Sequence, residues 1–185
     1  PEADAAIAAA LGGAIDLPVV TGFIGRSPSG DVSTLGRNGS DYTATILGAA
    51  LGASVIEIWS DTDGVMTADP KKVRRVFPIP MMTYEEAMEM SHFGAKVLHP
   101  PTMYPAIEKK IPIHIKNTFN PTAPGTIISD VQAPNEYPIR GISSIDEIAL
   151  MRVEGPGMVG IAGIAMRIFS ALARKKISII LISQA

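Results

Sequence analysis

Apolar and polar positions alternate along residues 1–130 in blocks of helical and strand-like length. The blocks that predict helices are the alanine-rich segment 2–11, the run of small and apolar residues 42–51, the segment 83–93, and the segment from His99-Pro100 to Lys109. In the third of these, Thr83 and Glu86 have the spacing of a capping box. Short apolar blocks predict strands over 17–21, 54–59, 113–115 and 126–128. Strands that alternate with helices favour an α/β fold, with a parallel sheet covered by helices on both faces.

Loops and linkers divide the chain into two parts. A glycine turn over 22–25 leads into a polar loop that ends near Leu35, and a second polar stretch covers 60–69. Between Asn117 and Pro138 four prolines interrupt the pattern. We therefore expect a first domain over 1–130, a linker over 131–138 and a second domain over 139–185. The second domain begins as one β-α-β unit, with strands over 145–153 and 177–183, a glycine-rich turn over 155–163 and a helix over 164–176.

Composition narrows the classes of function. The 185 residues include no cysteine, which excludes disulfide frameworks, thiolate zinc sites and cysteine nucleophiles. Sixteen basic and eighteen acidic residues give a net charge of −2 without a sustained basic run, so we expect no nucleic-acid partner. Apolar stretches are too short for a membrane span. The chain starts at a proline and stops inside an apolar run, so it looks like an excerpt.

The segment 34–41 (TLGRNGSD) is the first candidate for chemistry. Its glycines let the backbone approach a ligand, and the N–H groups of the following helix point to the same place. Arg37 offers a planar fork for a carboxylate or phosphate. The alternative is an N-capped helix, with Ser40 or Asp41 as the cap and Arg37 in solvent.

The loop 60–64 (SDTDG) follows a predicted strand and is the second candidate. In an open α/β sheet the ligand crevice lies beyond the carboxyl ends of the strands. Asp61 and Asp63 could accept hydrogen bonds from a ribose or hold a metal, and Lys71 brings a cation to the end of the loop. The positions of glycine and glutamate do not fit a calcium loop. A plain polar turn remains the alternative.

Two further motifs are less specific. In the segment 93–100 (FGAKVLHP), Lys96 is placed to meet a phosphate as a point charge, whereas His99 before a proline is more typical of a structural donor. Residues 155–160 (GPGMVG) fit a dinucleotide fingerprint, but the acidic residue expected about twenty positions later is missing and Pro156 removes a backbone donor. The histidines lack the spacing of metal ligands, so we expect no metal site formed by the protein alone.

Taken together in this order, the segments resemble aspartate kinase. The matching blocks are VVTGFIG (19–25), TLGRNGSDYTA (34–44), EIWSDTDGVMTADP (57–70), YEEAMEMSHFGAKVLHP (84–100) and PIHIKNTFNPTAPGT (112–126). Residues 139–185 resemble the start of the family's regulatory ACT domain, so the glycine-rich turn of 155–160 joins its first strand and helix. The resemblance implies a three-layer α/β/α sandwich of the amino acid kinase fold with a mainly parallel sheet, followed by a partial ferredoxin-like ACT domain.

The resemblance also implies a reaction and a set of site residues. The reaction is transfer of the γ-phosphoryl of MgATP to the side-chain carboxylate of L-aspartate, the first step toward lysine, threonine, methionine and isoleucine. By motif position, Phe23, Arg37, Gly39, Ser40 and Asp41 belong to the aspartate side. Ser60, Asp61, Met66, Lys71 and Lys96 belong to the ATP side. Met66 and Lys71 stand where the family often has tyrosine and arginine, so the contact with the nucleotide is expected to be weaker.

A carboxylate nucleophile is already ionised and needs no general base. The residues must instead bring two anions together, with Arg37 gripping the substrate and Lys71 and Lys96 meeting the phosphates. Arg37 and Lys96 are therefore expected to face one cleft. Asp41 and Lys96 are the catalytic candidates, with Asp41 orienting the substrate ammonium or a lysine of the family's N-terminal Lys-Phe-Gly-Gly segment, which this sequence lacks.

The ACT resemblance implies an amino-acid effector and a homodimer or higher homo-oligomer. The residues of the expected effector site are mostly apolar: Met158, Ile161, Gly163, Ile164, Ser178, Ile179, Ile180 and Gln184. Lysine-inhibited members carry an acidic residue at the position of Ile180, so we expect threonine rather than lysine. We also expect a cytoplasmic enzyme. The alternatives are a non-catalytic amino-acid sensor with a kinase-like scaffold, an NAD-dependent oxidoreductase and a different amino acid kinase.

Overall fold

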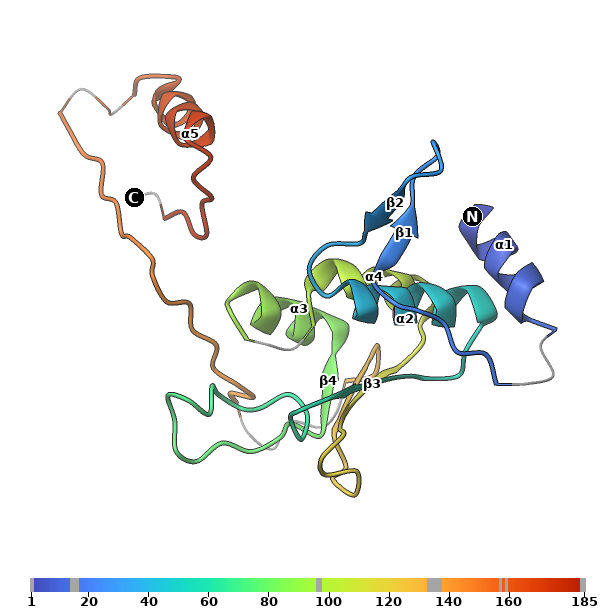
Figure 1. Cartoon of the computed structure of the whole chain (residues 1–185). Helices are drawn as coiled ribbons and strands as arrows, with labels where there is room; N and C mark the ends of the chain where they lie inside the picture. The colour runs from blue at the N-terminus through green and yellow to red at the C-terminus, as the bar shows by residue number, and fades with distance from the viewer. Residues whose placement is uncertain are drawn as a thin grey trace. The chain divides into compact units, whose positions relative to one another are not determined.

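The computed structural model describes residues 2–13, 17–95, 98–132, 138–156, 158 and 160–183 (Figure 1). It divides into two compact units, Pro1–Asp146 and Glu147–Ala185. The expected spans 1–130, 131–138 and 139–185 stay a prediction. Residues 138–146 count with the first unit by their contacts.

The first unit is built on a four-stranded sheet with the order β3-β5-β6-β4. The strands are β3 (Ile56–Ser60), β4 (Met81–Thr83), β5 (Ile113–Asn117) and β6 (Thr126–Ser129). β3 runs parallel to β5 and β4 parallel to β6, whereas β5 and β6 are antiparallel. The expected mainly parallel sheet is therefore confirmed. Because Ser60 pairs with Asn117, the polar segments that follow β3 and β5 leave the sheet at the same edge.

Helices α2 (Gly39–Leu51), α3 (Tyr84–His92) and α4 (Pro100–Lys109) lie on one side of this sheet (Figure 1). Burial alternates along β3 and β5, as it must when one face of a strand meets a core. Ile58 and Ile113 point into this core, where Met103 and Ala106 of α4 are completely buried. The sequence pattern is thus explained by one apolar layer between sheet and helices.

All four helices expected in the first unit form, including α1 (Glu2–Leu11). The capping box at α3 is present: the Thr83 hydroxyl accepts from the Glu86 N–H at 3.2 Å, and the Glu86 carboxylate accepts from the Thr83 N–H at 2.8 Å. α2 begins three residues earlier than expected, at Gly39, because Asn38 turns the chain with φ 55°.

The structure corrects the strand prediction in the first unit: one expected strand is absent, and three short strands form that were not expected. Residues 17–21 are not a buried strand but exposed coil, with Leu17 92% exposed, because no described strand pairs with them. The expected loop instead contains a hairpin of β1 (Ile24–Arg26) and β2 (Val32–Thr34). β4 has only three residues and directly follows Pro80, so the sequence pattern does not predict it.

The second unit contains one helix in its described part, α5 (Ile164–Arg174), which confirms the helix expected over 164–176. The strands expected over 145–153 and 177–183 do not form in the described residues, and Leu150 and Leu181 are exposed. A strand needs a neighbour to accept its backbone hydrogen bonds, and none is paired with these segments. α5 itself has no buried residue, so its apolar side chains have no core to enter within this unit.

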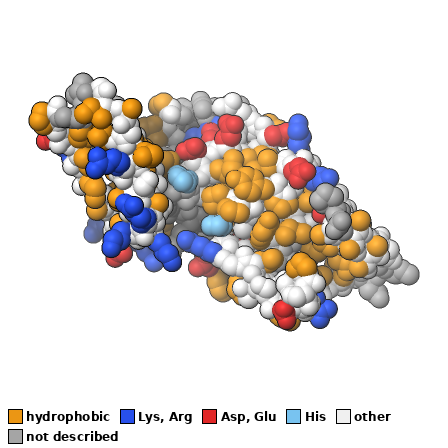
Figure 2. Space-filling model, turned by 90° about the horizontal axis from the view of Figure 1, so that it is seen from above, with side chains coloured by type: hydrophobic (Ala, Val, Ile, Leu, Met, Phe, Trp, Pro, Cys, Tyr) orange, Lys and Arg blue, Asp and Glu red, His pale blue; other side chains and the backbone are white. Residues whose placement is uncertain are grey.

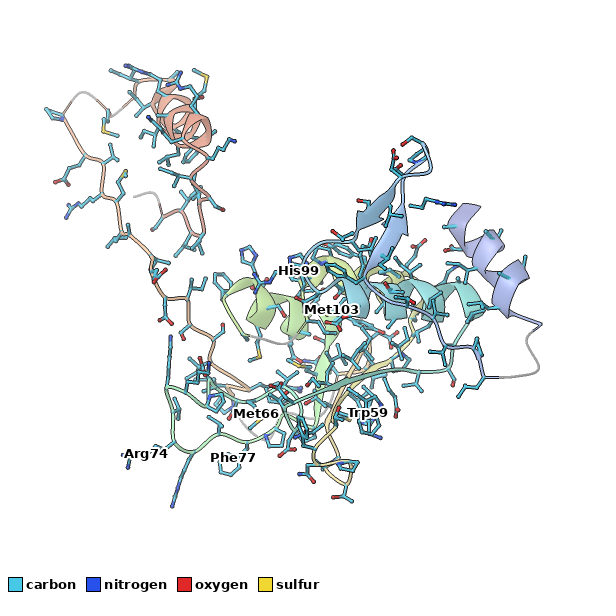
Figure 3. The ribbon with its side chains drawn as sticks, in the orientation of Figure 1. Trp59, Met66, Arg74, Phe77, His99 and Met103 are labelled. Atoms are coloured by element: carbon cyan, nitrogen blue, oxygen red, sulfur yellow. The ribbon has the colours of Figure 1, made fainter. Side chains whose placement is uncertain are left out.

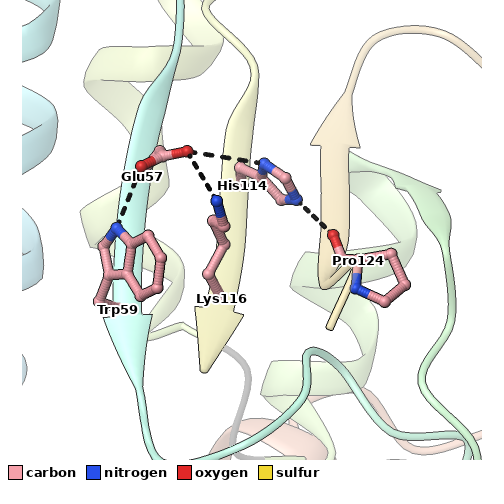
Figure 4. A network of polar contacts seen from close by, with 5 residues as sticks. All are labelled: Glu57, Trp59, His114, Lys116 and Pro124. Carbon is pink, nitrogen blue, oxygen red and sulfur yellow. Dashed lines mark hydrogen bonds and ion pairs between the residues drawn. The ribbon is translucent and has the colours of Figure 1, made fainter. Parts of the chain in front are cut away.

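The other face of the sheet carries a polar network (Figure 4). The Glu57 carboxylate accepts a hydrogen bond from the Trp59 indole N–H at 3.1 Å and pairs with the Lys116 ammonium at 3.3 Å. The Lys116 ammonium also lies 4.5 Å from the centre of the Trp59 ring. His114 links this group to the chain after β5 through the Pro124 carbonyl at 2.7 Å. These contacts fix β3 and β5 side by side.

Hydrophobic side chains are also exposed over part of the surface that Figure 2 shows. Phe23, Ile24 and Tyr104 are among the exposed large apolar residues of the first unit, each at least 44% accessible. Surfaces of this kind are often covered by another chain or segment. None of the described helices is long and apolar enough to cross a membrane.

Candidate functional site

A cleft of about 550 Å³ opens where β3 and β5 end. Its walls come from the turn before α2, the loop after β3, the end of α3 and the start of α4. The side chains that bring charge or apolar surface to it include Arg37, Asp41, Asp61, Met66, Lys71 and Ile142. A crevice beyond the carboxyl ends of parallel strands is the usual ligand position in α/β folds.

The turn before α2 forms the first wall. Gly36 and Asn38 both have positive φ, of 80° and 55°, which turns the chain sharply into the helix. The Asn38 amide donates to the Asp41 carboxylate at 3.0 Å, so Asp41 is held at the first turn of α2. Arg37 lies between Gly36 and Asn38, and its exposed side chain is available to an anion.

Phe23 packs closely against Gly39, the first residue of α2. A Cβ atom at Gly39 would come within 2.7 Å of the Phe23 ring, so only glycine fits there. Phe23 itself has φ 75°, a conformation that is strained for a bulky residue. Its N–H is bonded to the Thr43 hydroxyl at 3.0 Å, which in turn donates to the Gly39 carbonyl at 2.8 Å. The strained backbone is thus maintained by α2.

The loop after β3 forms the second wall and is anchored at two points. Buried Thr126 accepts from the Val65 N–H at 2.8 Å and donates to the Ile79 carbonyl at 2.6 Å. The Asp63 carboxylate accepts from the side-chain amides of Asn117, at 2.7 Å, and Asn120, at 3.1 Å. We call Asp63, Asn117 and Asn120 the Asp63 clamp. It joins the loop after β3 to the last residue of β5 and to the loop that follows it.

The clamp separates the roles of the two aspartates that follow β3. The Asp63 carboxylate is occupied by two amide donors, whereas Asp61 is exposed beside the cleft and has no hydrogen-bond or ion-pair partner among the described residues. Of the two, Asp61 is therefore the one available to a ligand. Asn117 and Asn120 are not among the residues predicted from the sequence, although their position at the end of β5 and just after it is a signal that could identify them.

Met66 and Lys71 belong to the segment 66–78, which we call the excursion and which contributes to the same wall. Figure 3 labels Met66, Arg74 and Phe77 of this segment. Met66 bridges to Pro78, and the Thr67 N–H donates to the Phe77 carbonyl at 2.8 Å, so the base of the excursion is a short antiparallel pair. At its tip the Asp69 carboxylate accepts from the Lys71 N–H at 2.8 Å. This turn presents the Lys71 side chain at the cleft.

The third wall joins α3 to α4. Ala95 and Leu98 both line the cleft, and Lys96 lies between them outside the described residues. The expectation that Arg37 and Lys96 share one cleft is therefore a prediction that rests on the neighbours of Lys96. His99 lines the cleft as the residue before α4, and its carbonyl accepts from the Thr102 N–H and hydroxyl at 2.8 and 2.7 Å.

The structure thus brings most of the expected site residues together. Arg37, Asp41, Ser60, Asp61, Met66 and Lys71 line the cleft. Gly39 and Ser40 adjoin it, since they lie between the lining residues Asn38 and Asp41, and Phe23 packs on Gly39. The roles assigned to these residues stay predictions.

The expected effector residues lie in the second unit. Gly163 and Ile164 are at the start of α5, Met158 and Ile161 precede it, and Ser178, Ile179 and Ile180 follow it. Gln184 lies outside the described residues. Ile161 is 56% exposed and Ile180 is 41% exposed, so these side chains present apolar surface.

One carboxylate on β3, in the polar network on the other face of the sheet, has a shifted pKa. The indole N–H of Trp59 lowers the pKa of Glu57 below its usual value; desolvation opposes this effect, and Lys116 and His114 lower the pKa further. The lowered pKa favours the ionised form of Glu57, which is the form that pairs with Lys116. Within the described residues, no group of three or more His, Asp or Glu side chains could hold a metal ion.

Two family models match the chain. The model described as amino acid kinase family matches residues 4–117. The model described as ACT domain matches residues 151–185. The first covers the sheet strands β3 and β5, the helices of the first unit and both polar walls of the cleft.

Named relatives agree with these matches. The chain is 49% identical over 166 residues to a bifunctional aspartokinase/homoserine dehydrogenase of Haemophilus influenzae, which covers 90% of this chain and 20% of that protein. It resembles the crystal structure of E. coli aspartokinase III in complex with aspartate and ADP, with 37% identity, a TM-score of 0.68, and coverage of 89% of this chain and 36% of that one. The same E. coli enzyme with lysine and aspartate gives 35% identity, a TM-score of 0.66, and coverage of 89% and 37%. The chain spans about a fifth of the length of the first of these relatives.

Proposed function

Since the chain belongs to the amino acid kinase family, we propose that the protein containing it is an aspartate kinase, which transfers the γ-phosphoryl of ATP to the side-chain carboxylate of L-aspartate. The observation that carries the proposal is the single cleft in which Arg37 and Asp41 face the loop of Asp61 and Lys71. The related E. coli enzyme was crystallised in complex with aspartate and ADP, and this pair of ligands fits a cleft with one wall for each.

The side chains suit a reaction between two anions. The Arg37 guanidinium can hold a substrate carboxylate through two parallel hydrogen bonds, which a lysine cannot reproduce. Lys71, with Lys96 from the adjoining segment, neutralises the phosphates. The nucleophilic carboxylate is ionised at neutral pH, so the reaction needs positioning and charge neutralisation rather than a base.

Asp41 is assigned to orientation. Its carboxylate already accepts a hydrogen bond from Asn38, which fixes it at the first turn of α2 beside Arg37. From there it can orient the substrate ammonium or a lysine supplied by another part of the polypeptide. It is not the base of the reaction, because the nucleophile carries no proton at neutral pH.

Mg²⁺ fits the same site. Magnesium in kinases is bound through one or two carboxylates together with substrate phosphates. Asp61 meets this requirement, since its exposed carboxylate lies at the cleft, whereas Asp63 is engaged in the clamp. Bound there, the ion would neutralise charge on the phosphates.

The finer proposals concern regulation, assembly and location. We place an amino-acid effector on the second unit, threonine in preference to lysine, and we expect homo-oligomers that form through this unit in the cytoplasm. The support is the ACT match over residues 151–185 and the apolar side chain of Ile180. Lysine is a ligand in one crystal structure of the related E. coli enzyme, so effector identity needs a direct assay.

The test is a kinase assay on the full-length protein, with Arg37→Lys and Arg26→Lys compared. Both arginines belong to the first unit, but Arg26 does not line the cleft and is the matched control. Loss of the forked contact should raise the KM for aspartate about tenfold or more in Arg37→Lys, whereas Arg26→Lys should match the parent. Equal kinetics for the two variants would contradict the placement of Arg37.

The same assay addresses the alternative of a non-catalytic sensor. A sensor would bind an amino acid but would not form aspartyl phosphate from ATP and aspartate. The polar lining of the cleft favours the enzyme, because a scaffold has no need for Arg37, Asp61 and Lys71 around one opening.

A further inference from the structure

We propose that residues 138–146, which we call the strap, form a wall of the nucleotide side of the cleft, and that Ile142 contacts the purine base there. This inference rests on the proposed function, because it assigns the nucleotide to the wall of Asp61 and Lys71. The strap lies outside the region that the amino acid kinase model matches. Ile142, Ser143 and Ser144 nevertheless line the cleft.

The strap is fastened to the rest of the first unit by a partly buried fork. The Arg140 side chain is 16% exposed, and its Nε and Nη1 atoms lie 3.2 and 3.3 Å from the two Glu86 carboxylate oxygens. Nη1 also donates to the Met81 carbonyl at 2.9 Å. Because Glu86 is the capping-box residue of α3, the strap is tied to the start of this helix. Paired, partly buried forks of this kind hold a fixed geometry.

Further contacts bring the strap against the excursion that bears Met66 and Lys71. The Ile142 N–H donates to the Thr67 carbonyl at 2.8 Å, so Ile142 lies beside the residue that follows Met66. The Lys72 ammonium donates to the Ser144 hydroxyl at 2.9 Å and to the Asp146 carboxylate at 2.5 Å. The strap and the excursion are therefore one connected wall.

The backbone of the strap also approaches α3 closely. A Cβ atom at Gly141 would come within 2.8 Å of the Met90 side chain, and one at Gly94 would collide with the Ser144 carbonyl. Glycines at both contacts let the two segments pack without a gap. The position of residues 141–144 at the cleft is thus set from two sides.

Within this fixed wall the side chain of Ile142 is unusually exposed for an apolar residue. It is 66% exposed although its backbone is bonded, and it lines the cleft together with Met66. The apolar side chains of Ile142 and Met66 can contact a flat apolar base, and the nearby Lys71 cation can contact an anionic group of the same ligand. A purine nucleoside triphosphate has this chemistry, and the base can bury Ile142 on binding.

The experiment compares Ile142→Asn with Ile139→Asn in the full-length protein. Ile139 is the matched control: it lies on the same strap and is 67% exposed, but it does not line the cleft. Binding of ATP and of inorganic tripolyphosphate is measured by calorimetry, with thermal unfolding as a check that both variants fold. Loss of one apolar contact with the base should weaken ATP binding about 5- to 10-fold in Ile142→Asn alone. Tripolyphosphate, which has no base, should bind equally to all three proteins.

Two results would overturn the inference: equal ATP affinity for both variants, or equal losses of ATP and tripolyphosphate affinity in Ile142→Asn. Binding is read without catalysis, so the inference and the proposed function can fail separately. If the parent protein binds ATP but does not phosphorylate aspartate, the aspartate kinase proposal fails. The inference about Ile142 is then still decided by the ATP affinities of the two variants. If the parent protein does not bind ATP, both fail.

Discussion

Tyr84 shows how a single side chain joins α3 to the segment just before β5. Its hydroxyl donates to the Ile111 carbonyl at 2.6 Å, and the residue is 6% exposed. Burial, with a smaller contribution from Asp130, raises the pKa of Tyr84 to about 12. The protonated form is thus favoured in the folded protein relative to the unfolded chain, whose tyrosine titrates near its ordinary value.

This raised pKa predicts an alkaline loss of stability. Between pH 10 and 12 the folded state holds a proton that the unfolded state has lost, so the free energy of unfolding should fall as pH rises, by an amount on the order of 2 kcal/mol. Tyr84→Phe should be about 1–2 kcal/mol less stable at pH 8, because the Ile111 carbonyl loses its partner, and should lack this part of the alkaline decline. Urea unfolding at pH 8 and pH 11 measures both effects. An unchanged decline in the variant would contradict the assignment to Tyr84.

At the residue scale, the sequence predicts which side chains belong to the candidate site. It does not predict which of them are already bonded to other residues of the protein. Arg37, Asp41 and Asp61, from the two polar segments, do line one cleft. The sequence offered Asp61 and Asp63 as equals, however, and only the amides of Asn117 and Asn120, more than fifty positions away, distinguish them. Such a distinction depends on tertiary contacts that no local pattern records.

At the scale of elements, the helices and the strands β3, β5 and β6 are predicted from the sequence, whereas the strands of three residues are not. The cap of α3 was visible as Thr83 and Glu86 at the right spacing, because a capping box is made entirely within one segment. A strand is defined by its neighbour. β4 and the hairpin of β1 and β2 have three residues per strand, and the apolar run at 17–21 has no partner among the described strands.

The Asp63 clamp is the element-scale contact that we expect to matter most. Asn117 is buried, donates to Asp63 and accepts from the Phe119 N–H at 2.9 Å, whereas Asn120 is exposed and makes the longer contact with Asp63. Asn117→Ala should therefore destabilise the fold by about 1–3 kcal/mol, and Asn120→Ala by less than about 1 kcal/mol.

Because the clamp orders the loop of Asp61, the KM for ATP should rise more in Asn117→Ala than the KM for aspartate. Denaturant unfolding of the full-length protein measures the loss of stability, and steady-state kinetics measures the two KM values. Asn120→Ala should show the smaller change in both experiments. Equal stability of the two variants would show that the clamp does not hold the loop.

At the scale of the whole molecule, the connection between the two units is the part that sequence patterns describe least well. Prolines and broken periodicity predict a linker over 131–138 and a second domain from 139 onward. Arg140, Ile142 and Asp146 nevertheless make their contacts with Glu86, Thr67 and Lys72 of the first unit. These contacts join residues more than fifty positions apart, and they involve single polar atoms rather than a repeated pattern. In the second unit the sequence pattern is sufficient: α5 is predicted from its local sequence, and it forms although none of its residues is buried.

Effector choice is the prediction that needs both units, because the ligand is expected on one and the activity on the other. A lysine side chain next to Ile180 would lose its water without gaining a carboxylate, at a cost of roughly several kcal/mol, whereas threonine carries no such charge. Threonine should therefore inhibit the full-length enzyme at concentrations where lysine does not. Ile180→Asp should add a response to lysine, while Ile182→Asp, a control on the same exposed segment, should not. Inhibition of the parent enzyme by lysine and not by threonine would contradict this assignment, and so would a lysine response that appears equally in both variants.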